Sequence, residues 1–315
     1  MFNKKNLMLV AILTIISIVG LTGCSKNETT EVLAEPTETV TIAHELGETT
    51  VVKNPARVIV FDYATLDSLN QMDVEIIGLP KSNIPAFLGQ YNDGKYEDVG
   101  TLFEPNFEKI FELQPDLILV AGRQREVYDE LAKIAPTIML SIDNQNYMAS
   151  FESNLRALGQ IFDKEEFVNN QLNDIEKRIN ELNALVAGSN KKALIIMAND
   201  GALSAYGKNS RFNLIHQEFA FPAADENIEV SNHGQKISFE YILEVNPDII
   251  FVIDRAAVTG GSNAAASVLD NDLVKMTNAY KNNGINYLSS HIWYVASGGV
   301  EGMNIMISEV EAAIK

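Results

Sequence analysis

The sequence predicts an α/β protein in which two lobes, each built on a mostly parallel sheet, are joined by a long helical segment. Three observations carry this prediction. Apolar runs of strand length alternate with helical periodicity in residues 57–141 and again from residue 192 onward, as in parallel sheets covered by helices. Between these halves lies a stretch with purely helical spacing, and one phrase occurs once in each half.

The N-terminus has the features of an export signal. A basic start precedes an almost wholly apolar run at residues 7–19, which is too short for a comfortable membrane span. Residues 1–23 end in Leu-Thr-Gly directly before Cys24, the only cysteine of the chain. This arrangement resembles a bacterial lipobox, which predicts that Cys24 is acylated after cleavage. The polar residues 24–38 predict a flexible tether.

The charge balance is strongly acidic. The chain has 24 Lys and Arg residues against 42 Asp and Glu residues, a formal net charge of −18. The export signal carries two lysines and no acid, so the remainder has a net charge of −20. Such a body is repelled by nucleic acid, which excludes that class of partner. An anionic ligand would need a local cluster of positive charge.

The first lobe is expected at residues 39–150. Residues 40–43 and 49–53 flank a Leu-Gly-Glu turn and predict a β-hairpin. Strands and helices then alternate as the sheet prediction requires. Strands are expected at 57–63, 75–80 and 137–141, and helices at 64–72 and 124–135.

The connecting segment is expected at residues 151–187. Its apolar residues recur in steps of three and four, which indicates helix. Asp163, with Glu166 three residues later, is typical of a capping box that begins a second helical segment. One broken or one kinked rod would then span residues 151–186 and reach roughly 50 Å.

The second lobe is expected at residues 188–315, where strand and helix alternation resumes. In the strand predicted at 291–296, Trp293 and Tyr294 should face opposite sides, with Trp293 toward the core. Strands are expected at 192–199, 202–207 and 291–296, and helices at 211–219 and 300–314.

The repeated phrase reads FEKIFELQPDLILVAGR at 107–123 and FEYILEVNPDIIFVIDR at 239–255, with nine of seventeen positions identical. Each copy predicts a short helix, a Pro-Asp turn and a buried strand. Arg123 and Arg255 then sit just past the carboxyl end of a strand, where open α/β sheets bind ligands. Facing lobes would bring both arginines to one cleft. In the alternative reading, the repeat reflects only fold duplication, and the arginines are surface ion-pair partners.

Four segments together resemble the substrate-binding lipoproteins of iron–siderophore ABC importers. They read VTIAHELGETTVVKNPARVIVFD, PNFEKIFELQPDLILVAGR, ISFEYILEVNPDIIFV and HIWYVASGG, and the resemblance covers essentially all of residues 39–315. Within that group the chain is most similar to the catecholate branch, which takes petrobactin and related ferric complexes. The resemblance implies a class III fold, with two Rossmann-like lobes joined by a long rigid helix and a shallow ligand cleft between them.

The resemblance also implies which residues bind the ligand. Three arginines would form a positive pocket, namely Arg123, Arg255 and Arg211, the last in GKNSRFNLI. A ferric tris-catecholate carries three negative charges, and arginine stays ionised, offers several planar donors and stacks on rings. His233 and Tyr294 match positions that complete the iron coordination when the ligand supplies only four donors. A phenolate and an imidazole suit such a hard metal better than thiolates would.

The implied partners follow from the same resemblance. Glu108 and Glu240, one per lobe, would salt-bridge arginines of a dimeric ABC permease with its ATPase; a carboxylate at a helix N-terminus is also favourable by itself. The protein is expected to be a monomer, anchored by lipid at the outer face of the cell membrane. It is expected to hold no permanent cofactor, because ferric iron arrives as the siderophore complex.

Other functions are left open at this point. A haem or cobalamin carrier could share the fold, although it would favour a neutral pocket or one with Met and His ligands. A zinc or manganese carrier would need clustered His, Asp or Glu ligands, and the four histidines are scattered. An exported hydrolase is the alternative of a different class. The chain has no G-x-S-x-G, H-E-x-x-H or glycine-rich phosphate motif, so we expect it not to be an enzyme.

Overall fold

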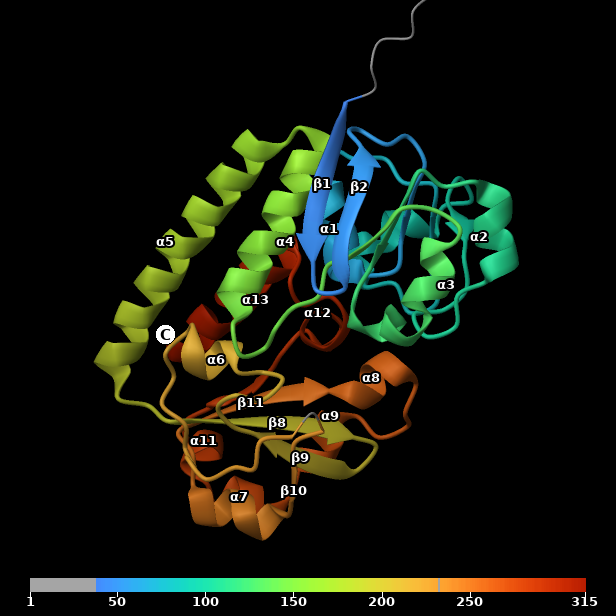
Figure 1. Ribbon diagram of the computed structural model, residues 1–315. Coiled ribbons are helices and arrows are strands. Elements are labelled where there is room, and N and C mark those ends of the chain that lie inside the picture. The colour runs from blue at the N-terminus through green and yellow to red at the C-terminus, as the bar shows by residue number, and fades with distance from the viewer. Residues whose placement is uncertain (1–37, 232) are drawn as a thin grey trace, which may run out of the picture. The chain divides into compact units, whose positions relative to one another are not determined.

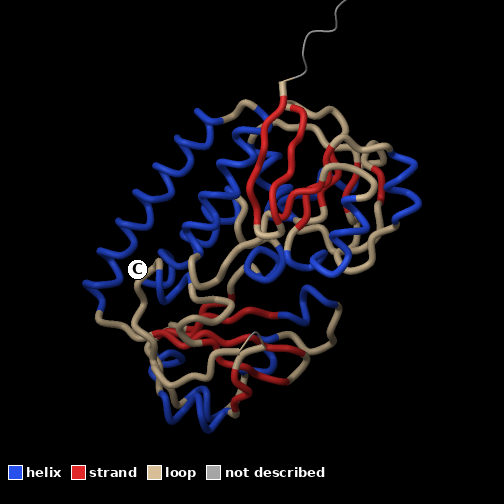
Figure 2. The backbone as a smooth tube through the Cα atoms, in the orientation of Figure 1, coloured by secondary structure: helices blue, strands red, loops and turns tan. Residues whose placement is uncertain are grey.

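Two five-stranded sheets organise residues 38–231 and 233–315, which are the residues described in the computed structural model (Figures 1 and 2). The predicted export signal, Cys24 and the predicted tether up to residue 37 lie outside the described residues. The α/β class predicted from the sequence is confirmed. No helix among the described residues is long and apolar enough to cross a membrane.

The first lobe begins with the predicted hairpin, formed by β1 (Thr39–His44) and β2 (Gly47–Val52), with Thr39 opposite Val52. A fully parallel sheet follows, in the order β5-β4-β3-β6-β7. Its strands are β3 (Val58–Val60), β4 (Gly78–Leu79), β5 (Glu97–Asp98), β6 (Leu117–Val120) and β7 (Thr137–Met139). Its helices are α1 (Tyr63–Gln71), η1 (Ala86–Asn92), α2 (Phe107–Leu113), η2 (Gly122–Val127) and α3 (Tyr128–Ala132).

The second lobe has the sheet order β10-β9-β8-β11-β12. Only β9 runs against its neighbours, because Asp200 and Gly201 both take positive φ in a tight turn after β8. The strands are β8 (Ala193–Asn199), β9 (Ala202–Tyr206), β10 (Gln235–Ile237), β11 (Ile249–Asp254) and β12 (Ile285–Tyr287). The helices are α6 (Leu214–Gln217), α7 (Phe239–Val245), α8 (Arg255–Thr259), α9 (Ala265–Leu269), α10 (Asp272–Lys275), α11 (Asn278–Lys281), α12 (Ser290–Val295) and α13 (Val300–Ile314).

The repeated phrase folds in the same way in both lobes. Helices α2 and α7 each end on a left-handed residue, Gln114 and Asn246, and both have a φ of 44°. The aspartates of the two Pro-Asp turns, Asp116 and Asp248, each accept a backbone N–H from the segment that leads into the neighbouring parallel strand. The sequence repeat is therefore a repeat of backbone conformation and of hydrogen bonding.

The connecting segment differs from the predicted rod. Helices α4 (Tyr147–Phe162) and α5 (Glu165–Ser189) lie side by side, so the chain turns back at Asp163 (Figure 1). The capping-box prediction was wrong, because Asp163 is left-handed, with a φ of 52°, and its carboxylate accepts from Lys53 Nζ at 2.7 Å. Helix α5 leads from the first lobe to the second, and its 25 residues span about 38 Å.

The segment predicted as a strand at 291–296 is helix α12. The prediction was wrong because the five residues after His291 are all apolar, and a short apolar run does not by itself distinguish a strand from a buried helix. Trp293 does lie in the core, where its Nε1 donates to Glu309 at 2.8 Å, while Tyr294 is only half-buried. The helix predicted at 211–219 shortens to α6, so Arg211 lies in a turn before it.

One hydrophobic core runs through both lobes. It joins one face of the first sheet, the helices α4, α5 and α13, and one face of the second sheet. Leu66 of α1, Phe151 of α4, Ile175 of α5, Met306 of α13 and Phe251 of β11 all belong to it and are fully buried. Two smaller clusters cover the outer faces of the sheets. The lobes are therefore packed together through the helical layer.

Candidate functional site

Arg123 follows the carboxyl end of β6, as the repeat predicts, and lies in the first turn of η2. The neighbouring Gln124 is buried, and its side-chain oxygen accepts a hydrogen bond from the backbone N–H of Ala121, which fixes this turn. From there Arg123 reaches across to the second lobe and donates from Nη2 to the carbonyl oxygen of Tyr294 at 3.1 Å.

Arg255 occupies the equivalent place after β11 and is the first residue of α8. The N-cap residue Asp254 accepts the backbone N–H of Ala257, so the position of Arg255 is set by the strand and the helix together. Its Nε donates to the hydroxyl of Tyr294 at 2.8 Å, and its Nη1 donates to the side-chain oxygen of Asn199 at 2.9 Å.

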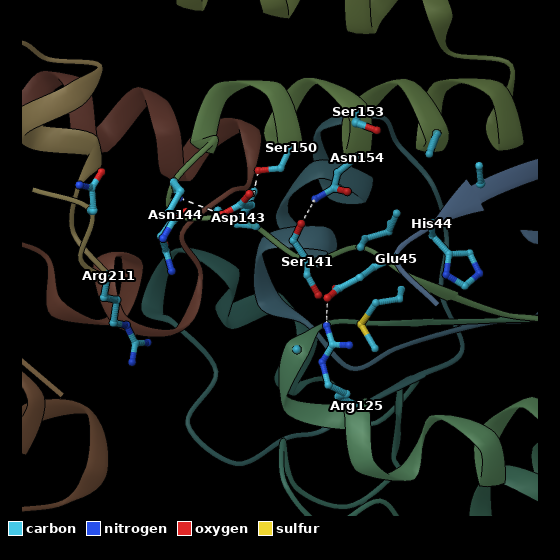
Figure 3. Close-up of a pocket in the computed structure, with 18 of the residues that line it drawn as sticks. His44, Glu45, Arg125, Ser141, Asp143, Asn144, Ser150, Ser153, Asn154 and Arg211 are labelled. Atoms are coloured by element: carbon cyan, nitrogen blue, oxygen red, sulfur yellow. Dashed lines mark hydrogen bonds and ion pairs between the residues drawn. The ribbon is translucent and has the colours of Figure 1, made fainter. Parts of the chain in front are cut away.

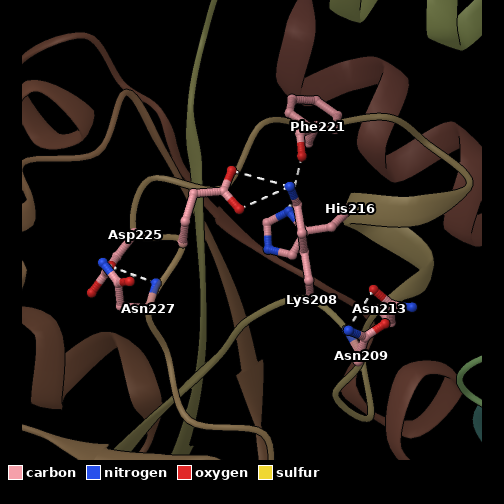
Figure 4. A network of polar contacts seen from close by, with 8 residues as sticks. Lys208, Asn209, Asn213, His216, Phe221, Asp225 and Asn227 are labelled. Atoms are coloured by element: carbon pink, nitrogen blue, oxygen red, sulfur yellow. Dashed lines mark hydrogen bonds and ion pairs between the residues drawn. The ribbon is translucent and has the colours of Figure 1, made fainter.

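Arg211 comes from the turn between β9 and α6. Its Nη2 donates to the carbonyl oxygen of Tyr294 at 2.6 Å, and its guanidinium carbon lies 4.2 Å from the centre of the Tyr294 ring. Contacts around the turn hold it in place (Figure 4). Asn213 accepts the backbone N–H of Asn209 at 2.9 Å, and a lysine–glutamate pair flanks the same turn, Lys208 with Glu226 at 2.8 Å.

The three predicted arginines therefore converge on Tyr294, although they come from three separate segments and both lobes. Within residues 38–231 and 233–315, none of Arg123, Arg211 and Arg255 pairs with a carboxylate within 4.0 Å. Burial lowers the pKa of Arg211, but a guanidinium stays ionised in proteins. The site thus concentrates three positive charges, none of them in a direct ion pair within the described part of the chain.

The environment of Tyr294 favours its ionisation. Burial alone would raise the pKa of this phenol. The hydrogen bond from Arg255 and the charges of Arg211, Arg255 and Arg123 outweigh burial, so the pKa lies below its usual value of 10.0. A phenolate at this position would be a good ligand for a hard cation.

An open hollow of about 530 Å³ lies in front of these groups. Its walls come from both lobes and include Arg123, Arg211, Tyr294 and the exposed side chain of His233. Gly234 places His233, because a Cβ at Gly234 would lie 2.7 Å from the Tyr206 ring and its φ is +71°. All five residues predicted for ligand or iron thus lie in or directly behind one cleft; Arg255 is the one behind it, hydrogen-bonded to Tyr294.

A second hollow of about 630 Å³ continues this cleft toward the hairpin and α4 (Figure 3). The two share Ser141, Asn144, Asn154 and Arg211 as lining residues. The walls of the second hollow mix neutral polar, apolar and charged residues. Besides Arg211 they carry Arg125, which is paired with Glu45 of the hairpin turn, and Asp143. A ligand larger than the first hollow therefore has room to extend.

Two polar residues near the arginines were missed from the sequence, Asp62 and Asn199. Asp62 lines the cleft and caps α1 by accepting the backbone N–H and the hydroxyl of Thr65. Burial raises its pKa, against the effect of those hydrogen bonds and of the nearby charge of Arg123. Asp62 follows the carboxyl end of a buried strand, and Asn199 is the last residue of another. This position after a buried strand is the sequence signal by which both could have been predicted.

Glu108 and Glu240 are not part of the cleft lining. They occupy the second position of α2 and of α7, are both exposed, and are related by the repeat. Hydrogen bonds at the start of α7, from its backbone and from Ser238, lower the pKa of Glu240. Each lobe thus presents one equivalent carboxylate at a helix N-terminus.

Comparison with known proteins places the chain in a family. The model of the periplasmic binding protein family matches residues 58–291. Petrobactin-binding protein YclQ of Bacillus subtilis is 43% identical over 99% of each chain, and its crystal structure aligns with a TM-score of 0.86 at 45% identity, over 88% of this chain and 99% of that one. The catecholate-siderophore binding protein VctP of Vibrio cholerae aligns with a TM-score of 0.83 at 37% identity, over 87% and 100%.

The name of a third relative refers to a different siderophore. The ferric-anguibactin-binding protein FatB of Vibrio anguillarum is 34% identical over 98% of each chain. These three relatives resemble this chain over nearly their whole length and have names or titles that refer to siderophores. Taken with the two α/β lobes and the cleft between them, the match shows that the chain belongs to the periplasmic binding protein family.

Proposed function

We propose that this protein is a lipid-anchored receptor that binds a ferric siderophore, of catecholate type such as petrobactin, and delivers it to an ABC permease for iron uptake. The observation that carries this proposal is the convergence of Arg123, Arg211 and Arg255 on Tyr294 beside an open hollow. The names of the relatives, which refer to petrobactin, anguibactin and catecholate siderophores, support it.

The charge of the ligand explains the composition of the site. A ferric tris-catecholate is a trianion, and the body of this protein is acidic overall. Three guanidinium groups without carboxylate partners reverse the sign of the field locally. Each can donate charge-assisted hydrogen bonds to catecholate oxygens, and its flat face can stack on a ring. Neutral ligands would gain little from such a pocket.

His233 and Tyr294 are proposed to bind iron directly when the siderophore supplies only four donor atoms. The lowered pKa of Tyr294 supports this role, because a ferric ion binds the phenolate. His233 is exposed and lines the same hollow as Tyr294, so both side chains can reach a metal held there. With a hexadentate ligand, both residues would remain in the outer sphere of the metal.

Delivery is proposed to depend on the outer ends of the two lobes. Glu108 and Glu240 are exposed and equivalent, so they can meet two equivalent arginines of a dimeric permease with its ATPase. The lipid on Cys24 would keep the receptor at the outer face of the membrane. Binding and release need no catalytic step and no permanent cofactor, and the receptor would act as a monomer.

A binding panel tests the function. The mature protein is titrated with a ferric tris-catecholate, a ferric tris-hydroxamate, haem and cobalamin, with quenching of Trp293 and tyrosine fluorescence as the signal. We expect the ferric tris-catecholate to bind tightly and to keep its charge-transfer band. Tight haem binding with a shifted Soret band, without ferric catecholate binding, would overturn the proposal in favour of a haem carrier.

A further inference from the structure

Phe103 is the exposed aromatic residue on the cleft wall. Its side chain is 70% exposed, although it lines the same hollow as Arg123, Arg211 and Tyr294. Phe111 is exposed to the same extent but does not line either of the two hollows of the cleft. An exposed phenylalanine ring gains free energy when a ligand covers it and removes its apolar surface from water. Its position on the cleft wall therefore indicates contact with a ligand.

The loop that carries Phe103 is fixed before any ligand arrives. Thr101 Oγ1 accepts the backbone N–H of Phe103 at 3.2 Å and that of Glu104 at 2.9 Å. The buried amide of Gln124 donates to the carbonyl of Leu102. The loop begins at Gly100, whose φ of +109° and close approach to the Glu104 carbonyl leave no room for a Cβ. The backbone that carries the ring is therefore fixed at the cleft wall.

The ring of Phe103 stands next to one of the cleft cations. The guanidinium carbon of Arg123 lies 6.0 Å from the ring centre, at the limit of a cation–π contact. Arg123 also donates to the Tyr294 carbonyl, so its position between the ring and Tyr294 is set from both sides. A planar ligand ring that carries anionic oxygens can meet both groups together, with its face or edge on Phe103 and its oxygens on Arg123.

We propose that Phe103 and Arg123 form an aromatic subsite that takes one catecholate ring of the ferric ligand. This inference rests on the proposed function and deepens it, because it identifies Phe103 as the side chain that makes the site prefer siderophores with aromatic donor groups. Arg123, Arg211 and Arg255 attract any iron complex of sufficient negative charge, including those built from carboxylates. Phe103 favours aromatic ligands over these, since a carboxylate complex offers no ring to pack against it.

The test compares substitutions that separate the ring from its apolar area. Phe103→Tyr keeps the ring, Phe103→Leu keeps apolar volume without a ring, and Phe103→Ala removes both. A ferric tris-catecholate is titrated against each variant and against Phe111→Ala, the matched control with an equally exposed side chain. Because Phe103 is exposed, we expect all variants to keep the melting temperature of the unmodified protein, and thermal unfolding checks this.

We expect Phe103→Ala and Phe103→Leu to weaken binding by about fivefold to tenfold, the size of a lost aromatic pair. Phe103→Tyr and Phe111→Ala should bind within about twofold of the unmodified protein, because neither loses the ring at the cleft. Equal affinity in Phe103→Leu would overturn the aromatic subsite and leave the proposed function standing. Failure of the unmodified protein to bind any ferric catecholate would overturn both.

Discussion

Replacing Asp67 by asparagine should increase the stability of the protein relative to the unmodified chain, and this gain should be larger at pH 8 than at pH 5. Asp67 lies on α1, is fully buried, and accepts the backbone N–H of Gly302 at 2.8 Å, near the start of α13. Its other oxygen has no hydrogen-bond partner among the described residues. A Cβ on Gly299 would collide with the oxygen that accepts from Gly302, so the carboxylate is packed tightly against the start of α13.

The sign follows from the proton balance. Burial raises the pKa of Asp67 from 3.8 to about 7. The folded protein therefore holds this proton over a pH range in which the unfolded chain has released it. Stability falls as pH rises from about 4 to about 7, and the full penalty applies above that. A difference of about three pKa units is worth about 4 kcal/mol, of which about 2–3 kcal/mol develops between pH 5 and pH 8.

Urea unfolding of both proteins at pH 5 and pH 8 measures this effect. The free energy of unfolding of Asp67→Asn minus that of the unmodified protein should be about 2–3 kcal/mol more positive at pH 8 than at pH 5. Asp163→Asn is the control, because hydrogen bonds from Lys53 and Asn54 lower the pKa of that carboxylate, so its effect should be equal at both pH values. A difference for Asp67→Asn that does not change with pH would refute the reasoning.

Three further predictions concern the cleft and the proposed docking surface. Arg211→Gln should weaken binding of a ferric tris-catecholate by about 1–3 kcal/mol, the contribution of a charged hydrogen bond, and unchanged affinity by fluorescence quenching would contradict it. Arg255→Gln should raise the pKa of Tyr294, because the hydrogen bond and the charge of Arg255 lower it. The tyrosinate absorbance of Tyr294, identified by comparison with Tyr294→Phe, should then appear at higher pH than in the unmodified protein. Glu108→Ala combined with Glu240→Ala should leave ligand binding intact but stop iron uptake by cells, and normal uptake by the double variant would count against docking.

The repeat allowed much of the fold to be predicted from the sequence. A helix, a Pro-Asp turn and a buried strand are local patterns, and they recur with the same left-handed residue at Gln114 and Asn246. The strands that carry Arg123 and Arg255 were therefore placed correctly, and the shared cleft followed from the duplication. Patterns that depend on a neighbouring segment were harder to interpret.

Two errors show this dependence. The run at 292–296 is apolar without a break because most of α12 is packed among other elements, so its periodicity did not reveal a helix. At Asp163 the expected cap was drawn away by Lys53 and Asn54, which are more than a hundred residues distant along the chain. Contacts of this kind are decided by packing, which a single sequence does not display.

The site was predictable in part. Arg123 and Arg255 could be found from the position of a charge after a buried strand. Arg211 and Tyr294 lie in a turn and a short helix with no comparable pattern, and only the family resemblance identified them. Phe103 could not be identified, because an apolar residue in a loop looks the same in sequence whether it faces a cleft, the core or water.

The core that runs through both lobes and the helical layer limits how the cargo can leave. One wall of the cleft can swing outward only if apolar surface in that layer is exposed to water. Parting even 400 Å² of it would cost about 10 kcal/mol, more than the roughly 8 kcal/mol that holds a micromolar ligand. Opening of the cleft by thermal motion is therefore costly, and we expect release of the ligand to depend on the transporter.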